Sequence, residues 1–74
     1  MLYDEELDTS GLSCPQVLLQ VKQKLKHMET GKILKVISTD PSSVLDLKVF
    51  AAIHSHALLK VEQQKNQFVF WITK

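Results

Sequence analysis

The sequence contains one cysteine, Cys14, which stands directly before Pro15 at the start of a stretch with helical periodicity. The first turn of a helix has free backbone N–H groups and a partial positive charge, and both stabilise an anion. A cysteine at this place has a lowered thiol pKa, and the thiolate is the reactive form. We therefore predict that Cys14 is the N-cap of a helix and a nucleophile, with Pro15 at the first helical position.

A second interpretation of Cys14 is a small buried hydrophobe, because free cysteine is among the most buried residue types. The preceding segment, Thr9–Ser13, is mostly small and polar, which favours an exposed sulfur. Cysteine is also not a favoured N-cap residue, so helix stability alone does not explain its position. From the residues alone, a reactive thiol and a buried thiol both remain open.

The other chemically capable residues form no recognisable site. His27, His54 and His56 lack the spacing of a metal centre, and only one cysteine could assist them. The sequence shows no paired carboxylates, glycine-rich phosphate loop or Ser-His-Asp pattern. We therefore expect no metal and no cofactor.

Composition sets the class of protein. The chain has 74 residues, 45% hydrophobic and 23% charged, with a net charge of +1, which gives no reason to expect direct nucleic-acid or membrane binding. The N-terminus is acidic, unlike a secretory signal, and no apolar run approaches the ~20 residues that span a bilayer. Because it has a single thiol, the chain is expected in the reducing cytoplasm. We expect one domain, 1–74, in which residues 1–6 form a poorly ordered lead-in.

Two elements are predicted around the cysteine. A short strand covers Leu7–Leu12, and the helix after it ends near Gly31, a residue type that commonly follows a helix. The core-facing side of this helix is formed by residues spaced at about 100° per position: Val17, Leu18, Val21, Leu25 and Met28.

Four further elements follow. Ile33–Ser38 is short and β-branched and predicts a strand, and Asp40 before Pro41 signals the start of a helix over Ser43–Ser55. Leu58–Gln63 and Gln67–Lys74 flank a short turn and predict a β-hairpin. The resulting order, βαβαββ, predicts a two-layer α/β sandwich with both helices on one face of a four-stranded mixed sheet.

The stretch LDTSGLSCPQVLLQVKQKL, with STDPSSVLDL and HALLKV further on, resembles the TusA/SirA/YedF family of small sulfur carriers. That family has a Cys-Pro-x-Pro motif after a Leu-Asp-x-x-Gly-Leu lead, and its fold is the same βαβαββ sandwich. One residue departs from the motif: Val17 stands in place of the second proline, which bears on stiffness near the cysteine and on partner recognition. The matching residues are Leu7, Asp8, Gly11, Leu12, Cys14, Pro15, Asp40, Pro41, Asp46 and His56.

The resemblance implies a carrier mechanism. Cys14 would accept a sulfane sulfur from a donor protein of the cysteine desulfurase or rhodanese type. It would hold this sulfur as a persulfide and pass it to an acceptor sulfurtransferase, for example in tRNA thiolation. Gly11, Leu12 and Pro15 would support the cysteine. The alternative is a protein-interaction or regulatory module that keeps the fold without carrying sulfur, and the change at Val17 favours it.

Two surfaces are candidates for protein contacts. Leu19, Lys22 and Lys26 lie on the polar side of the first helix and are predicted to dock partners, although an ordinary solvated helix face would look the same. In the second helix a second apolar stripe lies opposite the core-facing side, which predicts a homodimer or a partner site. This stripe consists of Leu45, Val49 and Ala52.

Overall fold

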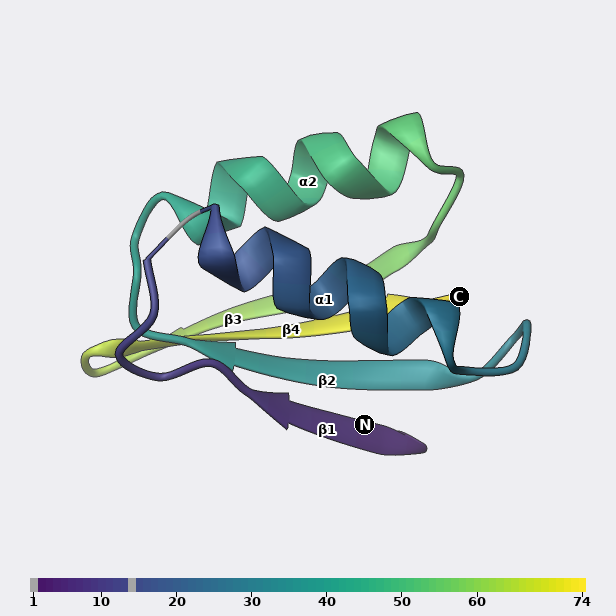
Figure 1. Ribbon diagram of the computed structural model, residues 1–74. Helices are drawn as coiled ribbons and strands as arrows, with labels where there is room; N and C mark the ends of the chain where they lie inside the picture. Colours follow the sequence, from purple (N-terminus) through teal and green to yellow (C-terminus); the bar gives the residue numbers. More distant parts are fainter. Residues whose placement is uncertain (1, 14) are drawn as a thin grey trace.

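Two helices cover one face of a four-stranded sheet (Figure 1). The computed structural model describes residues 2–13 and 15–74. The predicted βαβαββ two-layer α/β sandwich is confirmed. Its elements are β1 (Glu5–Asp8), α1 (Gln16–Lys26), β2 (Ile33–Ser38), α2 (Ser43–Ile53), β3 (Leu58–Gln64) and β4 (Gln67–Thr73).

The sheet is mixed, with the strand order β1-β2-β4-β3. β1 pairs with β2 in parallel, whereas β4 pairs antiparallel with both β2 and β3. Because α1 is the crossover between two parallel strands, the carboxyl ends of β1 and β2 meet at one end of the sheet. The segments that follow these two strands therefore start side by side, and the amino ends of both helices lie at the same end of the molecule (Figure 1).

The core lies between the sheet and the helices. In β2 the side chains of Leu34, Val36 and Ser38 are buried, and the residues between them are less so. This alternation is the period-2 pattern of a strand with one covered face. The register places Val36 opposite Phe70, so the apolar faces of β2 and β4 coincide. The core cluster consists of Val17, Val21, Leu25, Met28, Leu34, Val36, Leu47, Phe50, Ala51, Phe70 and Ile72.

No helix of the described part of the chain lies over the other face of the sheet (Figure 1). Trp71 lies on this face and is 6% exposed. The ammonium groups of Lys35 and Lys60 lie 5.9 Å and 5.6 Å from its ring centroid. Long lysine side chains can cover an aromatic ring while keeping their charges in water. The indole is therefore a covered part of the sheet, which excludes an open stacking platform for nucleic-acid bases at this residue.

The boundaries of β1 differ from the prediction of Leu7–Leu12. The strand begins two residues earlier, so Glu5 and Glu6 belong to the sheet and not to a poorly ordered lead-in. Acidic residues are tolerated there because β1 is an edge strand and each carboxylate has a cationic neighbour. Glu5 lies 3.1 Å from the Lys24 ammonium and Glu6 lies 3.5 Å from that of Lys35.

The second helix ends at Ile53, two residues before the predicted end at Ser55. Ser55 has a φ of 60°, and the N–H of His56 donates to the carbonyl of Ala51 at 2.9 Å. A left-handed residue with this hydrogen bond is a common way to terminate a helix. The sequence did not show this ending because glycine, the usual residue in that conformation, is absent.

Leu47 and Leu45 offer a matched test of the core. Leu47 is 1% exposed and Leu45, on the same helix, is 66% exposed. We expect Leu47→Ala to lower the free energy of unfolding by about 2–5 kcal/mol, because it leaves a cavity in the core. Leu45→Ala should change it by less than about 0.5 kcal/mol. Urea denaturation followed by circular dichroism measures both, and equal losses would contradict this orientation of α2.

Candidate functional site

Three hydrogen bonds hold the segment before Cys14 against the end of β2. The backbone N–H and the hydroxyl of Thr9 both donate to the Ile37 carbonyl, at 2.8 Å and 2.6 Å. Thr9 is 1% exposed, so these bonds are sheltered from water. Two residues later, the N–H of Gly11 donates to the hydroxyl oxygen of Thr39 at 2.9 Å. The chain leading to the cysteine is thereby fastened to the sheet at two points.

The same segment turns sharply between these two points. Asp8 accepts a hydrogen bond from the N–H of Ser10 at 2.9 Å, and the N–H of Leu12 donates to the Thr9 carbonyl at 3.0 Å. Hydrogen bonds from the Ser10 side chain and then its backbone lower the pKa of Asp8 below its ordinary value. Gly11 has a φ of +84°, which other residues adopt only with strain. Gly11 and Leu12, which are predicted to support the cysteine, are both part of this turn.

Cys14 itself lies outside the described residues, so its exposure stays a prediction. The N-cap of α1 is Pro15 and not, as predicted, Cys14. The residues on either side, Ser13 and Pro15, are exposed. The predicted placement of Pro15 at the first helical position is wrong, because Pro15 is the N-cap and α1 begins at Gln16. Pro15 has φ −88° and ψ 5°, outside the helical region, and the Gln16 N–H donates to the Ser13 carbonyl in a tighter turn.

Val17, which replaces the motif proline, is fully buried in the core cluster. It is the second residue of α1, where backbone N–H groups have no partner within the helix. The prediction that Val17 lies on the core-facing side of the helix is confirmed. This position therefore contributes packing where the family motif has a rigid ring.

The predicted docking residues lie on the outer side of α1. Leu19 is 53% exposed, and Lys22 and Lys26 are exposed as well. Their spacing places them along one side of the helix. Lys24 instead points toward β1 and pairs with Glu5, whereas none of the ion pairs between described residues involves Lys22 or Lys26. Both of these charges face water, and docking through them stays a prediction.

The apolar stripe of α2 is exposed along its whole length. Leu45 is 66% and Val49 is 48% exposed, and Ala52 is exposed too. The stripe continues to Ile53, which is 69% exposed and which is not among the predicted stripe residues. Its position four residues after Val49 was the signal that could have revealed it. Beside the stripe, Leu18 of α1 lines a shallow hollow of about 270 Å³ together with Val49 and Ile53.

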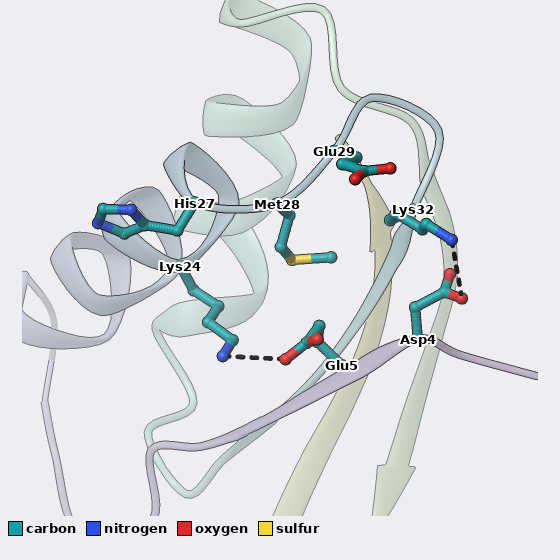
Figure 2. Close-up of a pocket in the computed structure, with 7 residues that line it drawn as sticks. All are labelled: Asp4, Glu5, Lys24, His27, Met28, Glu29 and Lys32. Carbon is teal, nitrogen blue, oxygen red and sulfur yellow. Dashed lines mark ion pairs between the residues drawn. The ribbon is translucent and has the colours of Figure 1, made fainter.

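A larger polar hollow, of about 380 Å³, lies at the opposite end of α1 (Figure 2). Two ion pairs border it: Lys24 with Glu5 at 3.1 Å and Lys32 with Asp4 at 3.9 Å. An 11-residue helix is about 16 Å long, so this hollow is remote from the cysteine motif. Its lining residues are Asp4, Glu5, Lys24, His27, Met28, Glu29 and Lys32.

Residues 2–13 and 15–74, which the structure describes, contain no metal-binding cluster and no helix that could span a membrane. No cluster of three or more histidine, cysteine or acidic side chains could hold a metal ion in that part of the chain. Neither α1 nor α2 has the length and apolar character needed to cross a bilayer.

Comparison with known proteins assigns the chain to one group. The family model described as Sulfurtransferase TusA matches residues 5–74. The Sulfur carrier protein TusA of Allochromatium vinosum is 42% identical over 72 residues, covering 97% of this chain and 95% of that protein. The protein of the same name from Pseudomonas syringae pv. syringae is 38% identical over 71 residues, covering 96% and 84%. That from Pseudomonas fluorescens is 35% identical over 74 residues, covering 100% and 89%.

Val17→Pro tests whether the helix tolerates the family's second proline. We expect the protein to stay folded, with a loss of less than about 1.5 kcal/mol, because the swap roughly conserves volume and removes no helical hydrogen bond. Val21→Pro is the control, since its N–H lies inside the helix and its loss should cost about 3 kcal/mol or more. Thermal unfolding measures both variants. A similar loss in the two would show that the first turn is not permissive.

Proposed function

Because the chain belongs to the Sulfurtransferase TusA family, we propose that it is a sulfur carrier with Cys14 as the persulfide site. The observation that carries this proposal is the match along nearly the whole chain to proteins named sulfur carriers, in a sequence with a single cysteine. Since a carrier needs one thiol and a partner on each side, the proposed role is one step of a relay without independent turnover. The chain would perform it as a single domain in the cytoplasm.

The transfer proceeds by thiol–persulfide exchange. The Cys14 thiolate attacks the outer sulfur of a persulfide on the donor protein and forms a new S–S bond with its own electron pair. The donor's S–S bond breaks, and its electron pair leaves on the donor's cysteine thiolate. Cys14 then carries the S–SH group, and an acceptor cysteine repeats the same attack on the outer sulfur. Neither step needs an oxidant or a second cysteine in this chain.

The charge distribution along α1 supports a thiolate at its start. Its first turn, Gln16–Leu19, contains no acidic residue, and among the described residues no side chain caps it. Lys24 and Lys26 occupy the last turn, where cations offset the negative end of the helix dipole. The positive end is thus left without a protein carboxylate in this turn, an arrangement that favours an anionic sulfur nearby.

Two kinds of partner follow from this chemistry. The donor would be a cysteine desulfurase or a rhodanese-type enzyme, and the acceptor would be a sulfurtransferase, as in tRNA thiolation. Leu19, Lys22 and Lys26 are the proposed docking residues for either partner. They start one turn after the motif, and their charges would be matched by an acidic patch on the partner.

The second candidate function is an interaction or regulatory module that does not carry sulfur. The exposed apolar stripe on α2 favours it, because a carrier does not need such a surface. A homodimer through this stripe stays a prediction as well. Leu45 and Ile53 lie at equal sequence distance on either side of Val49, so a two-fold axis near Val49 would pair Leu45 with Ile53 of a second copy.

Persulfide loading separates the carrier from the interaction module. We expect incubation with a cysteine desulfurase and cysteine to add about 32 Da, one sulfur atom, to the intact mass of the protein. Reduction should remove this added mass, because a persulfide is a thiol-reducible species. Intact-mass spectrometry measures it, and Cys14→Ser is the control that should gain nothing.

Two results would count against the carrier. One is an unmodified mass with each of a desulfurase and a rhodanese-type donor that load a known carrier in parallel. The other is equal loading of the Cys14→Ser variant, which would place the added sulfur elsewhere.

The oligomeric state tests the α2 stripe. We expect the protein at micromolar concentration to elute from size exclusion as a dimer, and Leu45→Lys to shift it to a monomer by placing a charge in the apolar contact. Gln63→Lys adds the same charge on exposed β3 and should leave the dimer intact. If the wild type elutes as a monomer and Leu45→Lys does not change its elution volume, the prediction of a homodimer is wrong.

A further inference from the structure

The parallel pairing of β1 and β2 brings two segments together that are about 28 residues apart in sequence. Thr9 follows β1 and bonds to Ile37 near the end of β2, and Gly11 bonds to Thr39, the first residue after β2. The first contact is buried, because Thr9 is 1% exposed. The second contact is exposed to water. The two contacts therefore differ in how much they contribute to the stability of the fold.

The buried contact belongs to the framework of the fold. Thr9 donates twice to one carbonyl, and removing its hydroxyl would leave a buried oxygen with one partner fewer. The exposed contact has a smaller role in global stability, because water can replace either partner of an exposed hydrogen bond. Its effect is local: it fixes the direction of the Gly11 N–H group, three residues before Cys14.

The backbone of Gly11 has a conformation that suits this bond. Its φ of +84° lies in the left-handed region, which reverses the chain and points its N–H toward the Thr39 side chain. A Cβ atom added at Gly11 would meet nothing within 4 Å, so space does not explain the glycine. The glycine is needed for its positive φ, and the Thr39 hydroxyl oxygen accepts the hydrogen bond from its N–H.

We propose that Thr39 is a positioning residue for sulfur transfer at Cys14. This proposal rests on the proposed function, since it concerns the same thiol. The Thr39 hydroxyl holds Gly11 and thereby limits the conformations of the loop that carries the cysteine to the start of α1. Without this bond the loop keeps its attachment at Thr9 and the contact of Leu12 with the core, but it loses the restraint at Gly11. The proposal then predicts that the Cys14 thiol lies less often near the positive end of α1 and that a smaller fraction of it is thiolate.

Three variants isolate the hydroxyl. Thr39→Val keeps the β-branched shape and removes the hydrogen-bond acceptor, whereas Thr39→Ser keeps the acceptor. Thr30→Val is the matched control, because Thr30 is an exposed threonine in the turn between α1 and β2, at the far end of the molecule. Circular dichroism and urea unfolding first establish that all three variants are folded.

The readout is the rate of Cys14 alkylation by iodoacetamide as a function of pH. Between about pH 6 and pH 10 the thiol titrates, whereas Asp8, whose pKa is lowered by its hydrogen bonds to Ser10, remains ionised. We expect Thr39→Val to raise the midpoint of this profile toward the free-cysteine value of ~8.5 and to slow alkylation at pH 7 by about threefold or more. Thr39→Ser and Thr30→Val should stay within about twofold of the wild type.

Persulfide loading from a cysteine desulfurase is measured on the same variants. We expect the loading rate of Thr39→Val to fall in parallel with its alkylation rate and that of Thr39→Ser to be preserved. The proposal is overturned if Thr39→Val keeps the wild-type alkylation profile, or if Thr39→Ser is impaired as strongly as Thr39→Val. A wild type that takes up no sulfur would defeat the proposed function, while the alkylation profiles would still decide the role of Thr39.

If Thr39→Val does not fold, Gly11→Ala tests the same bond from its other partner. Alanine fits the space but not the φ of +84°, so it should turn the N–H away from Thr39. The same upward shift of the alkylation midpoint is expected. An unchanged midpoint in this variant would overturn the proposal.

Discussion

The parallel pairing of β1 with β2 is the constraint on which the candidate site depends. It requires a crossover, which α1 supplies, and it brings the carboxyl ends of both strands to the same end of the sheet. The segment before Cys14 thus begins next to the end of β2, where Thr9 and Thr39 hold it. If the two strands paired in another way, the same motif would have no such attachment.

Burial of one face of α1 keeps this arrangement in place. Val17 and Val21 pack in the core with Val36 and Phe70, so the helix can neither rotate nor slide without exposing apolar surface. Val17 is the second residue of the helix, which places the core within one turn of the cysteine motif. Val17 stands where the family motif has its second proline, and its buried side chain anchors the first turn of α1 to the core.

The charged side chains discussed above lie in two regions of the surface. The acidic residues of β1 face lysines of neighbouring elements, as in the pairs of Glu5 with Lys24 and Glu6 with Lys35. Lys22 and Lys26 on α1 instead face water on the outer side of the helical layer, near the exposed Leu19. The apolar stripe of α2 lies on the same layer. The covered sheet face around Trp71 offers no comparable opening, so the helical layer is the side best suited to contacts with other proteins.

The sequence by itself determined the order of elements, the two-layer architecture and the presence of a single thiol. A hydrophobic period of 3.6 residues in a helix, or of 2 residues in a strand, as for Leu34 and Val36 in β2, is a local property of the sequence. Cys14 is the only cysteine in the sequence. The sequence placed β1 too late and Pro15 one position too far into the helix, because element ends depend on side-chain partners and backbone angles. Only the tertiary structure revealed Thr39 as the partner of Gly11, since a contact across 28 residues exists only after two strands have paired in a given register.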